Sequence, residues 1–146
     1  KGDIVYIETF ACKDRAIIGE LVSKFILLYR QAEAIVTNAK MRDANNLIKE
    51  RYAVWCNGFS PVGCFNSKNE EPFDTEIIND RKKNIDGAIM VCDDSGVVVI
   101  PKSCHTEEFY RKLEAIEEQE DIWFDCIDRR KWDTFDTVCM KKYLND

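Results

Sequence analysis

Residues 3–38, with the sequence DIVYIETFACKDRAIIGELVSKFILLYRQAEAIVTN, decide the fold because the spacing of their apolar residues changes twice. Both ends, 3–10 and 33–38, are rich in the β-branched and aromatic residues that are typical of strands. Between them, 15–31 carries apolar residues three and four positions apart, which is the spacing of an amphipathic helix. A strand, a helix and a strand in this order predict a βαβ unit with parallel strands. The stretch therefore predicts an α/β fold.

Later apolar runs predict a short helix and four strands, at 44–50 and at 52–58, 75–79, 88–92 and 97–101. The last two strands are joined by DDSG, whose Asp and Gly residues favour a tight hairpin turn. The polar segment 59–73 predicts a long connection. Amphipathic spacing over 106–131, and again over 132–144, predicts two tail helices.

The composition predicts one domain over residues 1–146, because 146 residues with 45% hydrophobic content suffice for one packed core. A net charge of −6 argues against a nucleic-acid surface, which needs clustered Lys and Arg. No apolar run approaches the roughly 20 residues of a membrane-spanning helix, and no secretory signal is visible. We therefore expect a cytoplasmic protein that binds neither nucleic acid nor membrane.

The seven cysteines form no C-x-x-C pair, and the single histidine, His105, completes no Cys/His zinc pattern with them. An odd number of irregularly spaced cysteines suits reduced thiols in a cytosol. Cys104 and His105 are neighbours in sequence, and neighbouring side chains rarely face each other as a catalytic pair does. The cysteines are therefore interpreted as unpaired thiols.

A charged pair, Arg42 and Asp43, follows the second strand of the βαβ unit. Ligands of such units gather at the carboxyl ends of strands, beside the starts of the following helices. The sequence Gly-Glu-Leu at 19–21 lies near one such helix start, where free N–H groups can bind a carboxylate. Both segments are therefore expected to face one pocket. The spacing alone favours a plainer interpretation, in which the pair belongs to a solvated turn that starts a helix at 44.

The chemistry that suits such a pocket is enolate formation from a 2-keto acid. A divalent cation would polarise the carbonyl, an arginine would stabilise the oxyanion, and the helix start would bind the carboxylate. Ligands that offer only oxygen suit magnesium or manganese better than zinc. Other carboxylates have simpler explanations, since Asp93 and Asp94 fit a hairpin turn and 114–121 fits the solvent-exposed face of a helix.

Four segments together resemble the family of the regulator of ribonuclease E activity A (RraA) and the 4-hydroxy-4-methyl-2-oxoglutarate/4-carboxy-4-hydroxy-2-oxoadipate aldolases. They are GDIVYIETFACKDRAIIGELVSKF (2–25), AEAIVTNAKMRD (32–43), NGFSPVG (57–63) and DGAIMVCDDSGVVVIP (86–101). The resemblance implies a swivelling β/β/α domain with mixed sheets, flanking helices and C-terminal tail helices. The family's amino-terminal segment is missing from the sequence, so we expect the chain to be the later part of a longer protein.

The resemblance also implies a substrate site. In the aldolases, backbone amides at a helix start bind the pyruvyl carboxylate, and this stretch corresponds to Gly19, Glu20, Leu21 and Val22. The acidic residue of the stretch, here Glu20, takes part in proton transfer through bound water. The arginine that contacts the pyruvyl oxygen corresponds to Arg42. Arg42 and Glu20 are thus the expected catalytic residues.

The metal is implied in the same way. Asp43 corresponds to the aspartate that holds Mg²⁺ or Mn²⁺, and a tail-helix glutamate of a neighbouring subunit, here Glu120 or alternatively Glu117, reaches the water bound to that metal. The family assembles as trimers or hexamers, so we expect a homotrimer or hexamer with sites between subunits.

The sequence departs from the pattern that the resemblance implies in four places, one of which is Asn57, where an arginine is expected before the glycine of the next loop. The glycine-rich turn after the first strand reads ETFAC (8–12), and the Asp-Gly before the charged pair reads Asn-Ala at 38–39. Between Glu20 and Arg42 there are 21 residues, one more than the resemblance to the aldolases implies, so the helix or its end must absorb an insertion. The leading hypothesis is a metal-dependent lyase acting on 2-keto acids, by retro-aldol cleavage or oxaloacetate decarboxylation. The alternative is a non-catalytic regulator that binds a partner such as a ribonuclease.

Overall fold

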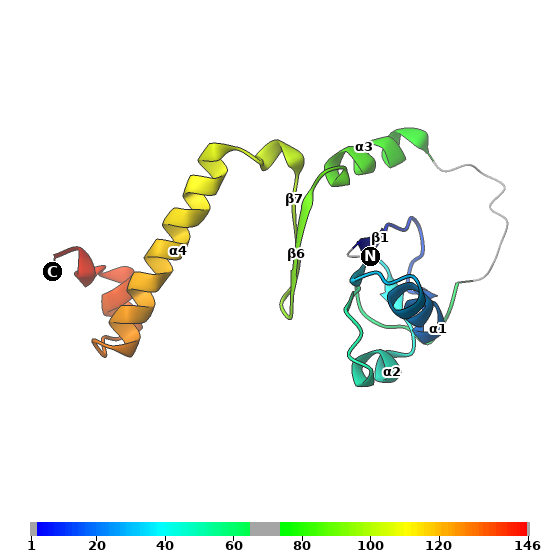
Figure 1. Cartoon of the computed structure of the whole chain (residues 1–146), viewed down its shortest axis with the longest axis horizontal. Coiled ribbons are helices and arrows are strands. Elements are labelled where there is room, and N and C mark those ends of the chain that lie inside the picture. Colours follow the sequence, from blue (N-terminus) through cyan, green and yellow to red (C-terminus); the bar gives the residue numbers. More distant parts are fainter. Residues whose placement is uncertain (1–2, 65–73, 146) are drawn as a thin grey trace. The chain divides into compact units, whose positions relative to one another are not determined.

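The computed structural model describes residues 3–64 and 74–145. The chain divides into two compact units, one comprising Lys1–Asp74 and Val91–Val98 and the other Thr75–Met90 and Val99–Asp146 (Figure 1). The single domain expected over 1–146 stays a prediction.

The first unit contains the predicted βαβ arrangement as a three-stranded parallel sheet. Its strands are β1 (Ile4–Ile7), β3 (Ala34–Thr37) and β5 (Val54–Trp55), in the order β1-β3-β5. The strand β3 pairs with β1 on one side and with β5 on the other, in parallel on both sides. Because it is central, all four of its residues are buried, and the run AIVT has the continuous apolar character typical of such strands. This confirms the predicted parallel pair.

A second pair of parallel strands was not predicted. β2 (Ala16–Ile18) pairs with β4 (Lys40–Met41), and the helix expected over 15–31 begins only at Glu20. The sequence interpretation was wrong here because the residues of β2 match the apolar spacing of the helix that follows. Two strands of three and two residues are also too short to show a period of their own.

The helix itself changes type along its length. α1 (Glu20–Lys24) is followed directly by a π-helical turn, η1 (Phe25–Tyr29), in which the N–H of Arg30 donates to the carbonyl of Phe25 at 3.0 Å. A π turn is wider than an α turn and takes in one more residue. The helix therefore ends in a wider turn than an α-helix of the same length would have.

The core of this unit lies between its two sheets and a second short helix, α2 (Ala44–Lys49), which confirms the helix predicted at 44–50. Ile35 of β3 and Met41 of β4 are fully buried, and Leu47 of α2 is 4% exposed. Burying such side chains stabilises a fold by roughly 1.5–3 kcal/mol each. Met41 directly precedes Arg42, so the charged pair extends from a firmly packed strand end.

The segment after β5 returns to the second sheet. Phe59 forms a β-bridge to Met41, and Gly63 forms one to Ala16. Of the connection predicted at 59–73, residues 65–73 lie outside the described residues. Its described part, 59–64, pairs with the strands β2 and β4 through these two bridges.

The hairpin predicted around DDSG is confirmed as β6 (Ile89–Asp93) and β7 (Gly96–Ile100). The strand predicted at 75–79 was wrong, because these residues begin α3 (Thr75–Ile85). The polar residues DRKKN that follow are good helix formers for the most part, and they extend the helix beyond the short apolar run.

The tail helix α4 (Glu107–Asp128) begins where the sequence predicts, since the Thr106 side chain accepts a hydrogen bond from the N–H of Phe109 at 3.2 Å. The prediction of a second continuous tail helix was wrong. This segment is divided into a π turn, η3 (Phe135–Cys139), and a 3₁₀ turn, η4 (Lys142–Asn145). Lys141, with a φ of 47°, separates the two. None of the helices in the described part of the chain has the length and apolar character needed to cross a membrane.

Candidate functional site

The candidate site lies at the carboxyl ends of the paired strands β2 and β4. Gly19 and Glu20 follow β2, and Arg42 and Asp43 follow β4. The N–H of Arg42 donates to the carbonyl of Ile18 at 3.0 Å, so the backbones of the two segments are joined directly. The two segments predicted to lie together do meet, but at the end of the β2–β4 sheet and not of the larger sheet.

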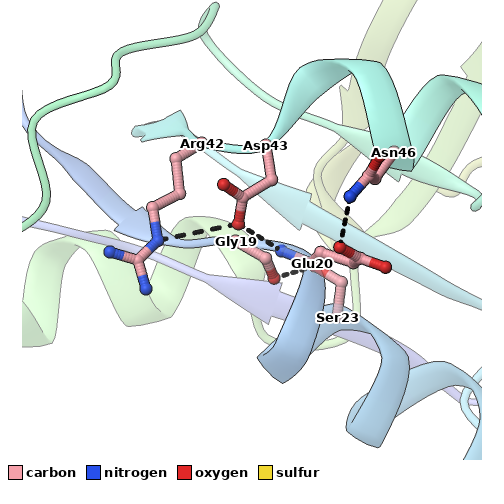
Figure 2. Close-up of polar contacts among 6 residues, drawn as sticks. All are labelled: Gly19, Glu20, Ser23, Arg42, Asp43 and Asn46. Carbon is pink, nitrogen blue, oxygen red and sulfur yellow. Dashed lines mark hydrogen bonds and ion pairs between the residues drawn. The ribbon is translucent and has the colours of Figure 1, made fainter.

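The carboxylate of Asp43 points toward the start of α1 (Figure 2). Its Oδ2 atom accepts a hydrogen bond from the N–H of Glu20 at 3.0 Å and lies 3.7 Å from Nε of Arg42. The Oδ1 atom makes no hydrogen bond or ion pair to any residue that the structure describes. One carboxylate oxygen thus orients the side chain while the other remains available to a ligand.

The backbone of Asp43 adopts the left-handed conformation, with φ 62° and ψ 35°. Asp is among the few residues other than Gly that tolerate this conformation. The amides of Asn46 and Leu47 bond to the backbone carbonyl of Asp43, and its side chain makes no cap bond to α2. Asp43 is therefore more than the residue that starts this helix, because its carboxylate faces a different helix.

Two residues that the sequence interpretation missed complete the arrangement. Asn46 Nδ2 donates to Glu20 Oε2 at 2.6 Å, and the fully buried hydroxyl of Ser23 donates to the carbonyl of Gly19 at 2.9 Å (Figure 2). These contacts hold the Glu20 carboxylate and the peptide at the helix start. Neither residue belongs to a sequence motif. Asn46 is identified by the pairing of α2 with α1, and Ser23 by its bond back to the start of its own helix.

The close approach of the two segments requires glycine at position 19. A Cβ atom added there would lie 2.2 Å from Oδ2 of Asp43 and 2.5 Å from Cγ of Arg42. Gly63 meets the same arginine, since its added Cβ would lie 3.1 Å from Nη1 of Arg42. The absence of these side chains lets Arg42 pack against backbone on two sides.

The remaining amides of the helix start belong to Leu21 and Val22. Neither N–H has a hydrogen-bond partner among the described residues, and the Leu21 side chain is 80% exposed. Free donors at a helix start favour an anionic group. The Glu20 N–H differs, because the Asp43 carboxylate already bonds to it.

The donor set fits a hard divalent cation held largely by water. Among the described residues, no three His, Cys, Asp or Glu side chains gather into a metal-binding group. A zinc centre usually needs three or four protein ligands, whereas Mg²⁺ is commonly bound through one or two carboxylates and keeps several waters. The Oδ1 atom of Asp43 would suit a cation bound in the second way.

The carboxyl ends of β1 and β3 form a different edge, where two of the departures from the family pattern bond to each other. The Asn38 side chain accepts from the N–H and Oγ1 of Thr9 at 2.8 and 2.9 Å, and donates to the carbonyl of Thr9 at 3.0 Å. It also donates to Glu8 Oε1 at 3.4 Å. The unusual turn and the unusual Asn-Ala are thus one hydrogen-bonded unit.

The other acidic residues have separate positions. Asp93 Oδ1 accepts the N–H groups of Ser95 and Gly96 at 2.7 and 3.1 Å, which is the turn role expected for it. Glu117 and Glu120 lie on α4, in the second compact unit. Their approach to a neighbouring subunit's site stays a prediction.

Comparison with known proteins bears on these assignments. A sequence model of the RraA-like proteins, described as Aldolase/RraA, matches residues 1–99. The chain belongs to the RraA-like family. The matched region includes every residue of the β2–β4 edge, so the Arg42–Asp43 pair and the helix start lie within the part that defines the family. No curated protein matches the chain.

Solved structures show the RraA-like fold. An uncharacterized protein from Pseudomonas syringae pv. tomato str. DC3000 shares 21% identity at a TM-score of 0.60, over 87% of this chain and 64% of that one. Streptomyces coelicolor RraAS2, described as an unusual member of the RNase ES inhibitor RraA protein family, shares 20% identity at a TM-score of 0.54, over 82% and 60%. The mixed α/β architecture expected from the sequence is confirmed. The chain spans less than two thirds of the length of either structure.

Proposed function

We propose that this protein is a divalent-metal-dependent lyase that acts on 2-keto acids, by retro-aldol cleavage of 4-hydroxy-4-methyl-2-oxoglutarate-type substrates or by oxaloacetate decarboxylation. The observation that carries the proposal is the Asp43 carboxylate, which bonds through Oδ2 to the Glu20 amide at 3.0 Å and keeps Oδ1 free. The family includes aldolases and ribonuclease inhibitors, so membership alone does not decide between them.

The residues of the chain divide the work among them. The Arg42 guanidinium stabilises the negative charge that develops on the keto oxygen, because a fixed cation is most effective where charge appears during the reaction. The free amides of Leu21 and Val22 bind the substrate carboxylate. Glu20, oriented by Asn46 at 2.6 Å, moves a proton through an intervening water.

Asp43 would hold the cation, with Mg²⁺ or Mn²⁺ as the ions that best match a single carboxylate and water. When bound, such an ion supplies Lewis-acid polarisation of the keto oxygen, which contributes several kcal/mol to transition-state stabilisation. A glutamate of a neighbouring subunit, Glu120 or Glu117, would complete the water network in a trimer or hexamer.

A coupled assay of pyruvate release tests the proposal. With oxaloacetate or 4-hydroxy-4-methyl-2-oxoglutarate as substrate, we expect turnover with added MgCl₂ or MnCl₂ and loss of turnover with excess EDTA. Re-addition of the metal should restore the rate. Pyruvate release that is unaffected by EDTA, or none above the rate of the metal alone, would contradict a metal-dependent lyase.

A second candidate is a non-catalytic regulator that binds a partner such as a ribonuclease. The Asn38–Thr9 hydrogen bonds favour it, because they occupy the edge at β1 and β3 where the family's glycine-rich turn would leave backbone open. Inhibition of ribonuclease E by the wild-type protein, without any pyruvate release, would support this alternative over the lyase.

A further inference from the structure

The turn before β2 brings two cysteines together that the sequence separates widely. The N–H of Arg15 donates to the carbonyl of Cys12 at 3.1 Å, which closes a four-residue turn directly before Ala16. Ala16 in turn bonds to the segment at 62–64, accepting from the N–H of Cys64 at 2.9 Å and donating to Val62 at 2.8 Å. Cys12 and Cys64 therefore extend from adjoining backbone segments.

Their thiols are neighbours and are accessible. The Cys12 side chain is near enough to act on the Cys64 thiol electrostatically. Cys64 is exposed and Cys12 is partly exposed, so solvent and small reagents reach the pair. Desolvation and, second, the Cys12 thiol raise the pKa of Cys64, while the Arg15 guanidinium opposes the shift.

We propose that Cys12 and Cys64 are a redox modification site that forms a reversible intramolecular disulfide in the folded protein. The sulfur atoms must approach to about 2 Å. The two residues lie on backbone segments that meet at Arg15 and Ala16, through the Arg15 N–H to Cys12 and the Cys64 N–H to Ala16. The disulfide would tie the turn at 12–15 to the segment that carries Gly63, which packs against Arg42.

The oxidant we name is a small-molecule disulfide such as glutathione disulfide. One cysteine thiolate attacks a sulfur of the reagent, which releases one glutathione thiolate and leaves a mixed disulfide on the protein. The second cysteine thiolate then attacks the protein sulfur of that mixed disulfide and releases the second glutathione. Two protein thiols are oxidised, one glutathione disulfide is reduced, and the two protons pass to the released thiolates.

The experiment exposes the native protein to glutathione disulfide, quenches it with acid and an alkylating reagent, and maps its peptides by mass spectrometry. We expect a loss of two of the seven thiols and one cross-linked pair of tryptic peptides, 2–13 and 52–68. Because 52–68 contains both Cys56 and Cys64, the same map is made with Cys56→Ser, in which the cross-link should persist. Dithiothreitol should reverse it.

Two kinds of variant sharpen the test. Cys12→Ser should lose the cross-link and retain one glutathione on Cys64, whereas Cys139→Ser, which removes another exposed thiol, should behave as the wild type. The melting temperature of the oxidised wild type should rise by about 5 °C or more, because the bond closes a long loop in the unfolded chain. Failure to form the 12–64 cross-link in native wild-type protein, pairing with other cysteines instead, or a lowered melting temperature on oxidation would each overturn the proposal.

Discussion

The two sheets of the first unit end in edges of opposite character. At the β1–β3 edge, the Asn38 side chain bonds to Thr9 through three hydrogen bonds, so these groups satisfy one another. At the β2–β4 edge, Arg42, Asp43 and Glu20 gather around one free carboxylate oxygen and the free amides of a helix start. The first edge is built to hold the fold together, whereas the second retains groups that can bind a ligand.

This difference shows why two unusual segments that lie together in the structure should be interpreted together. Considered one at a time, the altered turn at 8–12 and the Asn-Ala at 38–39 are two losses from the family pattern. In the structure the two segments bond to each other, because the Asn38 side chain supplies an acceptor and a donor to the Thr9 backbone. The β2–β4 edge is independent of this exchange, and its charged residues are all present.

The largest effect is expected from removing the negative charge of Asp43 at the β2–β4 edge. Asp43→Asn keeps a side-chain oxygen for the Glu20 amide and tolerates the left-handed backbone, but it loses the negative charge that would hold a cation. We expect pyruvate release to fall at least about a hundredfold, because a Lewis acid contributes several kcal/mol. Unfolding free energy, measured in urea, should change by less than about 0.5 kcal/mol. If the wild-type protein releases pyruvate and Asp43→Asn releases it at the same rate, Asp43 is not the metal ligand.

A second prediction concerns the close packing that creates the β2–β4 edge. Gly19→Ala introduces a Cβ 2.2 Å from Oδ2 of Asp43, where the carboxylate is anchored by the Glu20 amide, so the two segments must separate. We expect a loss of about 1–3 kcal/mol in unfolding free energy, as for other overpacked sites, together with reduced turnover. Gly63→Ala is the matched control, because its Cβ meets only the flexible end of Arg42 at 3.1 Å. Equal losses in the two variants would count against the close approach at position 19.

The sequence predicted the larger sheet well because its strands have distinct composition. The run AIVT of β3 is apolar at every position, as a central parallel strand requires, and its pairing with β1 followed from the βαβ pattern. It also predicted that the helix start at Glu20 and the pair at 42–43 would converge. That prediction came from the rule that strand ends and the starts of the following helices meet at one edge of a sheet, although the sheet concerned is β2–β4.

The rest was hidden for physical reasons. β2 and β4 pair over two or three residues, and the apolar residues of β2 continue the helical spacing of α1. Asn46 acts through a hydrogen bond from α2 to Glu20 of α1, and Ser23 acts through a bond back to the carbonyl of Gly19 in its own helix start. α3 was missed because the apolar run TEIIN was taken without the charged residues that extend it. Local composition therefore predicts strands of four residues better than it predicts the small sheet at the site.

The smallest expected effect compares the same substitution at the two edges. Asn38→Ala removes three hydrogen bonds to Thr9, and because Asn38 is exposed, water replaces part of the loss. We expect a cost of about 1 kcal/mol in unfolding free energy, measured in urea, and turnover within about twofold of wild type.

Asn46→Ala is the matched change at the β2–β4 edge, where another exposed Asn bonds to the Glu20 carboxylate at 2.6 Å. It should leave stability nearly unchanged and lower the rate of pyruvate release by about tenfold, because a proton-transfer group then loses its orientation. Asn38→Ala should thus lower stability with little effect on the rate, and Asn46→Ala should lower the rate with little effect on stability. If Asn38→Ala lowers turnover more than Asn46→Ala does, the ligand binds at the β1–β3 edge, and the assignment of the site to the β2–β4 edge is wrong.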